Sequence, residues 1–319
     1  MTGYFFQRLA LFVPTLILVS FVVFAIMRFL PGDPAIALLS QGGEGSYTEE
    51  DVQRMREKLG TDRQLHVQYA DFIKGLVTWD LGESFFYTDI PVARMLETRF
   101  PLSIELALFA LILSYLVAVP LGVLSAVKQD SWFDSVARVF TVGGIALPPF
   151  VVALLTIFVL ARFFGWLPPL GYAQLWTAPL TNLQQLIFPA LVLGYFNMAF
   201  ATRVTRSAML EVLREDYIRT ARSKGLQETI VIARHALKNA FLPVLTVAGF
   251  QLSRLIGGAV IIEVIFVIPG VGSLLVNSVL IRDYPIVQST VMLIAVLVLV
   301  LNLIVDLAYG WINPRIRYG

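Results

Sequence analysis

Residues 102–127 read LSIELALFALILSYLVAVPLGVLSAV, and this stretch decides the class of fold. Only one side chain in it is charged at neutral pH, Glu105, and that residue lies close to its beginning. A helix needs about 20 predominantly apolar residues to cross a lipid bilayer. The stretch therefore predicts a membrane-spanning helix.

Working outward along the chain, apolar stretches of similar character recur on both sides of this one. The sequence predicts an all-α membrane protein with six transmembrane helices, in which the shortest stretch is the fourth. The first stretch is longer than the roughly 7–15 apolar residues of a signal peptide, which predicts an uncleaved span. The six predicted spans cover residues 9–30, 102–127, 139–161, 186–202, 240–267 and 286–308.

The composition supports this class and excludes several others. Apolar residues make up 57% of the 319 residues, charged residues 14%, and the mean hydropathy is +0.77. Soluble domains carry about a quarter charged residues, so this balance excludes a disordered chain and a basic nucleic-acid-binding protein. The chain has no Cys, which excludes a disulfide scaffold and thiolate chemistry.

The distribution of Lys and Arg predicts the orientation of the spans. Thirteen of them flank one side of the predicted spans, and eight of these fall between residues 203 and 238. The opposite short loops hold only Arg162 and Arg282. Because short cytoplasmic loops are enriched in basic residues, we expect the thirteen in the cytoplasm, together with both termini.

Residues 31–100 are then an external subdomain. Thr48-Glu49-Glu50-Asp51 is typical of a capping box and Gly60 of a helix stop, while 65–77 predicts a second helix. The segment is either a structured loop with no partner or a lid or docking surface. We thus expect an N-terminal span (1–30), this external subdomain (31–100), a core of five spans with a cytoplasmic loop at 203–239 (101–310), and a cytoplasmic tail (311–319).

The sequence lacks the motifs of a membrane enzyme. It contains no G-x-x-x-x-G-K-[ST] loop for phosphates, no H-E-x-x-H zinc motif and no G-x-S-x-G nucleophile elbow. The two histidines, His66 and His235, both fall in aqueous segments. We therefore predict no catalytic residue, no metal site and no cofactor bound by this chain itself.

Three charged residues inside the predicted spans need an explanation. Arg254, Glu263 and Asp306 lie in stretches that are otherwise apolar, and ionisable groups at such depth face a bundle interior or an aqueous cavity. Arg254 and Glu263 are about 13 Å apart along a helix, so they do not pair with each other. A structural ion pair and a role in a substrate path are both open readings.

The loop between the fourth and fifth spans is the most informative segment. Residues 215–243 read EDYIRTARSKGLQETIVIARHALKNAFLP, in which apolar residues recur at helical spacing on both sides of Gly225. The pattern predicts two amphipathic helices joined by a tight turn at the membrane surface. Attachment to anionic headgroups is the simpler reading of such a segment, but it does not explain the bend at Gly225.

This loop resembles the "EAA" loop of bacterial ABC importers in the dipeptide, oligopeptide, nickel and glutathione permease family. The form of the peptide branch, D-Y-x-R-T-A-R-x-K-G followed by R-H-x-L-x-N-x-x-L-P, matches from Asp216 to Gly225 and from Arg234 to Pro243. Further similar strings occur in order along the chain, including LPGDP (30–34), DLGES (80–84), PLSIEL (101–106), EVIFVIPGVG (263–272) and RDYP (282–285).

The resemblance implies the fold and assembly of a type I importer permease of the bacterial inner membrane. In that family the loop forms a coupling helix that docks on a separate ATPase, and the matching positions here are Asp216, Tyr217, Thr220, Ala221, Lys224, Gly225 and Leu226.

The implied function is alternating access. This chain would form half of the path for a small solute, above all a peptide, as a heterodimer with a second permease. An external solute-binding protein would deliver the solute, and one or two ATP-binding subunits would bind ATP and Mg. The rival reading is a self-contained secondary transporter or channel, and a membrane enzyme or scaffold is a weaker one.

Overall fold

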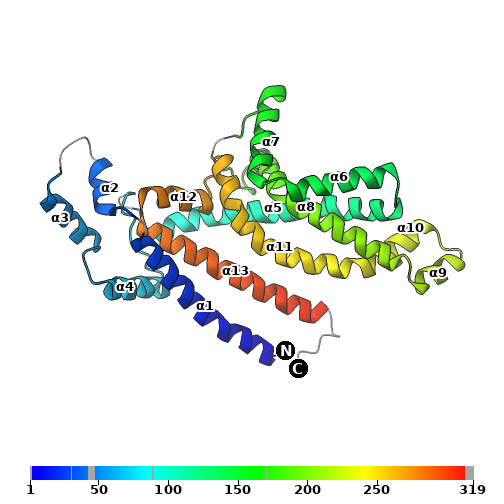
Figure 1. The fold of residues 1–319 in the computed structure, drawn as a ribbon, viewed down its shortest axis with the longest axis horizontal. Helices are drawn as coiled ribbons and strands as arrows, with labels where there is room; N and C mark the ends of the chain where they lie inside the picture. Colours follow the sequence, from blue (N-terminus) through cyan, green and yellow to red (C-terminus); the bar gives the residue numbers. More distant parts are fainter. Residues whose placement is uncertain (1, 30, 42–46, 88–89, 170, 313–319) are drawn as a thin grey trace. The chain divides into compact units, whose positions relative to one another are not determined.

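The structure is a computed structural model that describes residues 2–29, 31–41, 47–87, 90–169 and 171–312. It is built of helices (Figure 1) and divides into two compact units. Unit 1 comprises residues 1–103, 269–303 and 313–319, and unit 2 comprises 104–268 and 304–312. The predicted tail beyond residue 312 lies outside the described residues.

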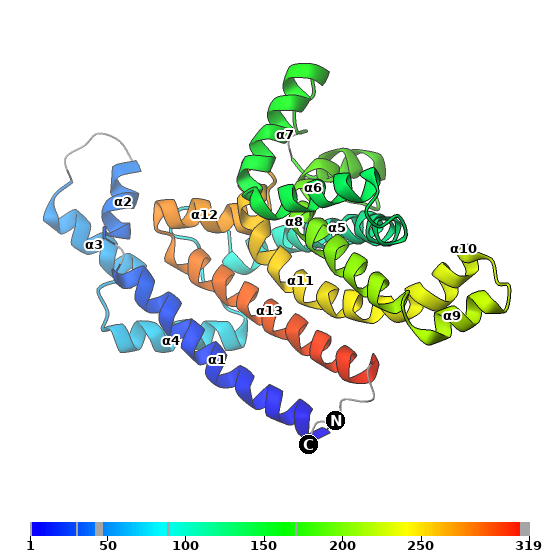
Figure 2. The ribbon, with the colours of Figure 1, turned by 45° about the vertical axis from the view of Figure 1, so that its right-hand side comes forward.

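Unit 1 contains the helices that precede and follow the long central part of the chain. They are α1 (Thr2–Phe29), α2 (Pro34–Gln41), α3 (Glu49–Leu59), α4 (Leu65–Thr78), the beginning of α5 (Val92–Val127), α12 (Val271–Ile281) and most of α13 (Tyr284–Ile312). Figures 1 and 2 both show α4 beside α1. The two helices meet through Tyr69, whose ring lies 5.3 Å from that of Phe24 and whose hydroxyl lies 2.9 Å from Ser20 Oγ.

The predicted helices of residues 31–100 are confirmed in unit 1. Thr48 caps α3 in a complete capping box with Asp51, which satisfies backbone N–H groups that the first turn cannot bond internally. Gly60 ends α3 in the left-handed conformation, with φ of 68°. α2 and α12 are further helices that the hydrophobic pattern alone did not predict.

Unit 2 is organised around α8 (Pro179–Val212). It also contains the rest of α5, α6 (Trp132–Ala146), α7 (Pro149–Phe164), α9 (Asp216–Ser223), α10 (Glu228–Ile230), the π-helix η1 (Val231–Ala236) and α11 (Leu237–Ile265). Small residues let neighbouring helices approach α8 closely. A Cβ added at Gly144 of α6 would lie 2.6 Å from the Cβ of Ala199, so only glycine fits there.

The third predicted span corresponds to two helices that meet at a bend. Residues 139–161 fall in two helices, α6 and α7, which meet at an angle of 112°, and Figure 2 shows α7 turned away from α6. Proline restricts the residue before it to extended conformations and has no N–H to donate. Leu147 is accordingly extended, and the Pro148-Pro149 pair ends one helix and begins the next.

The other predicted spans correspond to long helices. Among the described residues, five helices are long and apolar enough to cross a membrane, and the bent pair would make a sixth. The fourth span was predicted at 186–202, whereas α8 runs from Pro179 to Val212. The last turns of α8 contain Arg203 and Arg206, which the charge pattern places in the cytoplasmic loop. Similarly, the second span was predicted to begin at residue 102, whereas its helix, α5, begins at Val92.

Candidate functional site

The segment from α9 to the beginning of α11 forms the predicted helix–turn–helix. α9 has eight residues, with Asp216 in its first turn where a negative charge is favourable. The helix ends at Ser223, Lys224 is its C-cap, and Gly225 follows with φ of 74°. This left-handed conformation favours glycine because it has no Cβ. The Gly225 N–H donates to the carbonyl of Arg222 at 2.9 Å, which closes the turn.

The second arm is continuous from Glu228 to Ile265 and contains a π-helical turn at Val231–Ala236. In an α-helix, residues five positions apart lie on different faces, whereas the wider π-turn brings them onto the same face. Val231 and Ala236 are five apart and both are buried in one cluster. The π-turn therefore adjusts the register so that this arm presents a continuous apolar side to α9.

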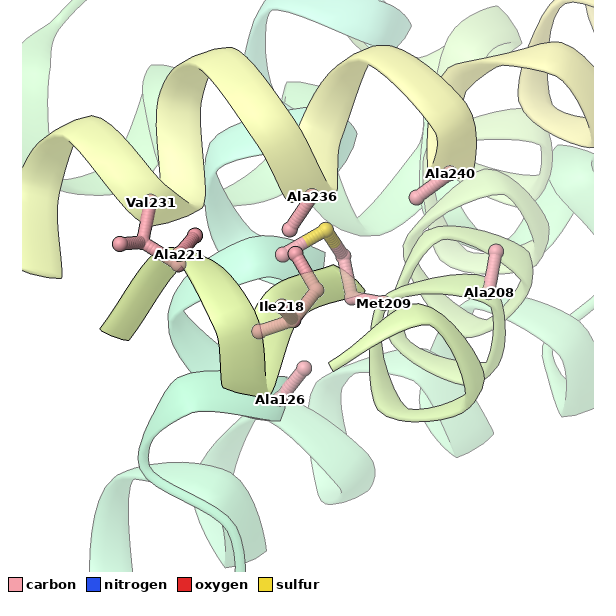
Figure 3. Packing of buried hydrophobic residues seen from close by; sticks show 8 residues of the cluster. All are labelled: Ala126, Ala208, Met209, Ile218, Ala221, Val231, Ala236 and Ala240. Carbon is pink, nitrogen blue, oxygen red and sulfur yellow. The ribbon is translucent and has the colours of Figure 1, made fainter. Parts of the chain in front are cut away.

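A cluster of buried apolar residues attaches α9 to its neighbours (Figure 3). Ile218 has no exposed surface, and its side chain lies in one buried cluster with those of Met209 and Ala126. The members come from α5, α8, α9, η1 and α11: Ala126, Ala208, Met209, Ile218, Ala221, Val231, Ala236 and Ala240. Since the residues are buried and packed, α9 moves with these helices rather than as a loose loop.

Most of the predicted coupling residues lie on the exposed side of this turn. Tyr217 and Leu226 are large, apolar and about two-fifths exposed. The remaining exposed members are Asp216, Thr220, Lys224 and Gly225. Ala221 differs, because it is buried in the cluster, and we assign it to the anchor of α9 rather than to its outer face.

Polar contacts hold the exposed groups in place. Asn239 Nδ2 donates to Tyr217 Oη at 2.8 Å, which ties α9 to α11. Thr220 Oγ1 donates to the carbonyl of Asp216 at 3.0 Å. Arg222 spans the turn to Glu228, with its Nη2 2.6 Å from Oε1, and this hydrogen bond raises the pKa of Arg222 further above its usual value.

The three charged residues predicted inside the spans have different environments. Arg254 of α11 is exposed, with its guanidinium 5.5 Å from the ring centre of Phe196. Glu263 of the same helix is fully buried. Asp306 belongs to α13, and its side chain is outside the described part of the structure. Among described residues, no cluster of three or more His, Asp or Glu side chains could hold a metal.

The structure adds a buried ion pair that the sequence did not indicate. Asp134 of α6 is fully buried and accepts two hydrogen bonds from Arg206 of α8, at 2.7 and 2.8 Å. Ser125 of α5 also bonds this carboxylate. The two residues are 72 positions apart, so no local sequence signal pairs them.

Other polar contacts lie within unit 2. Tyr115 Oη bonds Gln251 Oε1 at 2.6 Å and links α5 to α11. Glu105 accepts from the Tyr172 hydroxyl at 2.5 Å and from Asn182 Nδ2 at 2.8 Å. These contacts satisfy polar groups that would be costly in an apolar environment.

Comparison with known proteins places this architecture in a family. Residues 118–318 match the family described as binding-protein-dependent transport system inner membrane component, and residues 1–107 match the family of the N-terminal part of such membrane components. The solved structure of the MetNI methionine ABC transporter in inward-facing conformations has a similar fold, with a TM-score of 0.55 at 15% identity. The match covers 69% of this chain and 96% of that one.

Relatives match over the full length of both chains. A peptide transport system permease protein of Brucella abortus is 41% identical, the dipeptide transport system permease protein DppB of Haemophilus influenzae 40%, and the glutathione transport system permease protein GsiC of Salmonella choleraesuis 37%. In each case the match covers all of this chain and all of the relative. The chain belongs to the family of binding-protein-dependent transport system inner membrane components.

Proposed function

We propose that this chain is the permease subunit of an ATP-driven importer of small peptides. Its relatives are named as permeases for peptides, dipeptides and glutathione. These cargoes share peptide bonds and charged ends, and this shared chemistry supports a peptide rather than a metal ion or a sugar. The chain forms half of the path, and a second, related permease supplies the other half.

The rigid turn at Gly225 is the observation that carries the proposal. Tyr217, Leu226 and Ile230 expose apolar surface on a turn whose other side is anchored to four neighbouring elements. Exposed apolar side chains on a fixed scaffold are typical of a protein-binding surface. An ATPase subunit docked there transmits its movement to the membrane helices, because a packed element moves as a body.

The charges on this turn favour a protein partner over a lipid surface. Arg219 lies 3.4 Å from Asp216, and Arg222 is paired with Glu228. Binding to anionic headgroups needs an excess of unpaired positive charge, whereas here both arginines of α9 already have acidic neighbours. A surface of paired charges and exposed apolar residues on α9 fits a groove on another subunit.

The position of Arg254 supports a shared path. An exposed guanidinium in a membrane-spanning helix is costly against lipid. The cost of the Arg254 guanidinium is avoided if this side of α11 faces the second permease or an aqueous path between the two subunits. We assign Arg254 to that face, with α9 and both termini in the cytoplasm and residues 31–100 outside, where a solute-binding protein delivers the cargo.

Replacement of Gly225 tests the coupling role. Gly225→Trp adds a bulky side chain at an exposed turn, where a Cβ meets nothing within 4 Å. Gly165 provides a matched control, because it also has a positive φ, 61°, and open space around a Cβ. We expect Gly225→Trp to abolish ATP-dependent uptake of labelled dialanine by the assembled transporter, and Gly165→Trp to retain it. Normal uptake by Gly225→Trp contradicts the coupling role.

The rival secondary transporter has a separate test. The full-length chain alone is reconstituted into vesicles that carry an ion gradient but no ATP. We expect no uptake of dialanine, because the energy comes from partner subunits. Gradient-driven uptake under these conditions would favour the rival.

A further inference from the structure

Three hollows in unit 1 join into one groove between α1, α4 and α13. The largest is about 430 Å³ and mainly apolar, the second about 290 Å³ and polar, and the third about 170 Å³. The third shares Leu76, Leu81 and Ser289 with the first, and it shares Asp71, Pro285 and Gln288 with the second. The three hollows therefore adjoin one another along the groove, from a polar end to an apolar end.

The polar end carries an excess of positive charge. Arg28, Lys58 and Arg63 line it, and Asp71 is the acidic residue among its lining side chains. Asp71 lies 3.3 Å from Arg63 and neutralises one of the three charges. The remaining two favour an anionic ligand.

Two buried hydrogen-bond donors at this end have no partner among the described residues. Arg28 directs Nε and Nη2 at the Oε1 atom of Gln68, at 2.9 and 2.5 Å, and its Nη1 is buried without an acceptor. Gln288 is only 5% exposed, and its Nε2 is also unpartnered. Buried donors are almost always bonded. Two of them lining one hollow indicate that an acceptor from a ligand belongs there.

Arg28 is held in a fixed position for this role. Its guanidinium lies 4.7 Å from the ring centre of Phe24 and 4.3 Å from that of Tyr284. The two rings and Gln68 fix the guanidinium at the end of α1, with one edge turned to the groove.

The apolar end opens along the membrane-spanning helices. Val13 and Ile17 of α1, Val77 of α4 and Val296 of α13 line it, and all four have exposed surface. Since α1 and α13 are long and apolar enough to cross a membrane, this part of the groove lies along membrane-spanning segments. Trp79, at the rim, is typical of the boundary between the apolar core and the headgroups.

We propose that this groove binds one anionic phospholipid. The phosphate accepts hydrogen bonds from Arg28 and Gln288 and is attracted by Lys58, while an acyl chain lies along the apolar part. A free anion would use only the polar end and a neutral lipid only the apolar end, whereas the groove matches both parts of one amphipathic molecule. This site is lined by residues outside the turn at Gly225 and does not rest on the proposed function.

Native mass spectrometry of the full-length protein in neutral detergent tests the site. The probes are dioleoyl phosphatidylglycerol, dioleoyl phosphatidylcholine and inorganic phosphate. We expect preferential retention of phosphatidylglycerol and no competition from equimolar phosphate. Lys58→Ala should lower its affinity about fivefold. Arg63→Ala should lower it as well, because the negative charge of Asp71 loses its partner, whereas Lys74→Ala, an exposed change on α4 outside the groove, should not.

The apolar part has its own matched pair of variants on α13. Val296→Trp fills the groove and should weaken binding of both lipids, while Val300→Trp, one turn away and equally exposed, should leave both unchanged. Equal retention of the two lipids, or effective competition by phosphate or by dialanine, overturns the proposal. Wild-type phosphatidylglycerol binding by Val296→Trp overturns it as well.

Discussion

Ile218→Ala should release α9 from the membrane helices without unfolding the rest of the protein. α9 has only eight residues, and an isolated helix shorter than about 12–15 residues is marginal in water. Its stability therefore comes from packing. Ile218 and Ala221 are its buried residues, so the substitution removes most of the anchor.

The magnitudes identify which contact holds α9. Truncation of a buried isoleucine to alanine costs about 2–5 kcal/mol. The Arg222–Glu228 pair is about half exposed on both sides, and such a pair contributes about 0–1 kcal/mol. The ion pair cannot replace the lost packing. A loss of about 3 kcal/mol increases the open population of α9 roughly a hundredfold.

Hydrogen exchange followed by mass spectrometry measures this opening. In Ile218→Ala, peptides covering residues 213–227 should exchange roughly a hundredfold faster, while peptides from α8 keep the wild-type rate. Arg222→Ala is the control and should change the rate severalfold at most. Wild-type exchange of α9 in Ile218→Ala, or faster exchange across all of unit 2, would refute the anchoring role.

Three further changes test the fold. Asp134→Asn leaves the charge of Arg206 without its buried partner, which costs about 3 kcal/mol of stability. We expect the folded protein to survive only to a lower temperature, measured as the loss of its size-exclusion peak after heating. Gly144→Val should lower this temperature too, because Ala199 leaves no room for the added side chain and such overpacking costs about 1–3 kcal/mol of stability. Hydrogen bonds from Thr48 lower the pKa of Asp51, so its stabilisation of α3 is present above about pH 4 and is lost as the pH falls through the lowered pKa. Amide protection of α3 should therefore decrease on acidification in the wild type but not in Asp51→Asn.

Local sequence signals predicted much of the fold and the turn of the candidate site. Apolar stretches identified the long helices, and the short-range chemistry of Thr48, Gly60 and Gly225 identified a helix beginning, a helix end and a turn. Each of these features depends on residues within a few positions of one another, so it is visible in a single sequence. The resemblance of residues 215–243 to a known loop then added the expected role.

Contacts between distant parts of the chain could not be predicted in this way. Asp134 and Arg206 are 72 positions apart, and nothing in the local pattern of either residue identifies the other. The same pair explains why α8 continues past its apolar stretch, because the charge of Arg206 is neutralised inside the bundle. The bend at Pro148-Pro149 was visible as a pair of prolines, but its angle depends on tertiary packing.

The buried ion pair and the apolar cluster of unit 2 both involve α5 and α8. Ser125 bonds Asp134, and its neighbour Ala126 packs in the cluster that holds α9. Arg206, which pairs with Asp134, lies two positions before Ala208, and Ala208 is another member of that cluster. The ion pair thus fixes α5, α6 and α8 to one another where the cluster attaches α9. If a partner moves α9, these helices must follow, because the buried charges oppose separation more strongly than the exposed pairs on α9 do. The buried contacts therefore lie behind the turn and its outer face is exposed, which is the arrangement that the proposed coupling through Gly225 requires.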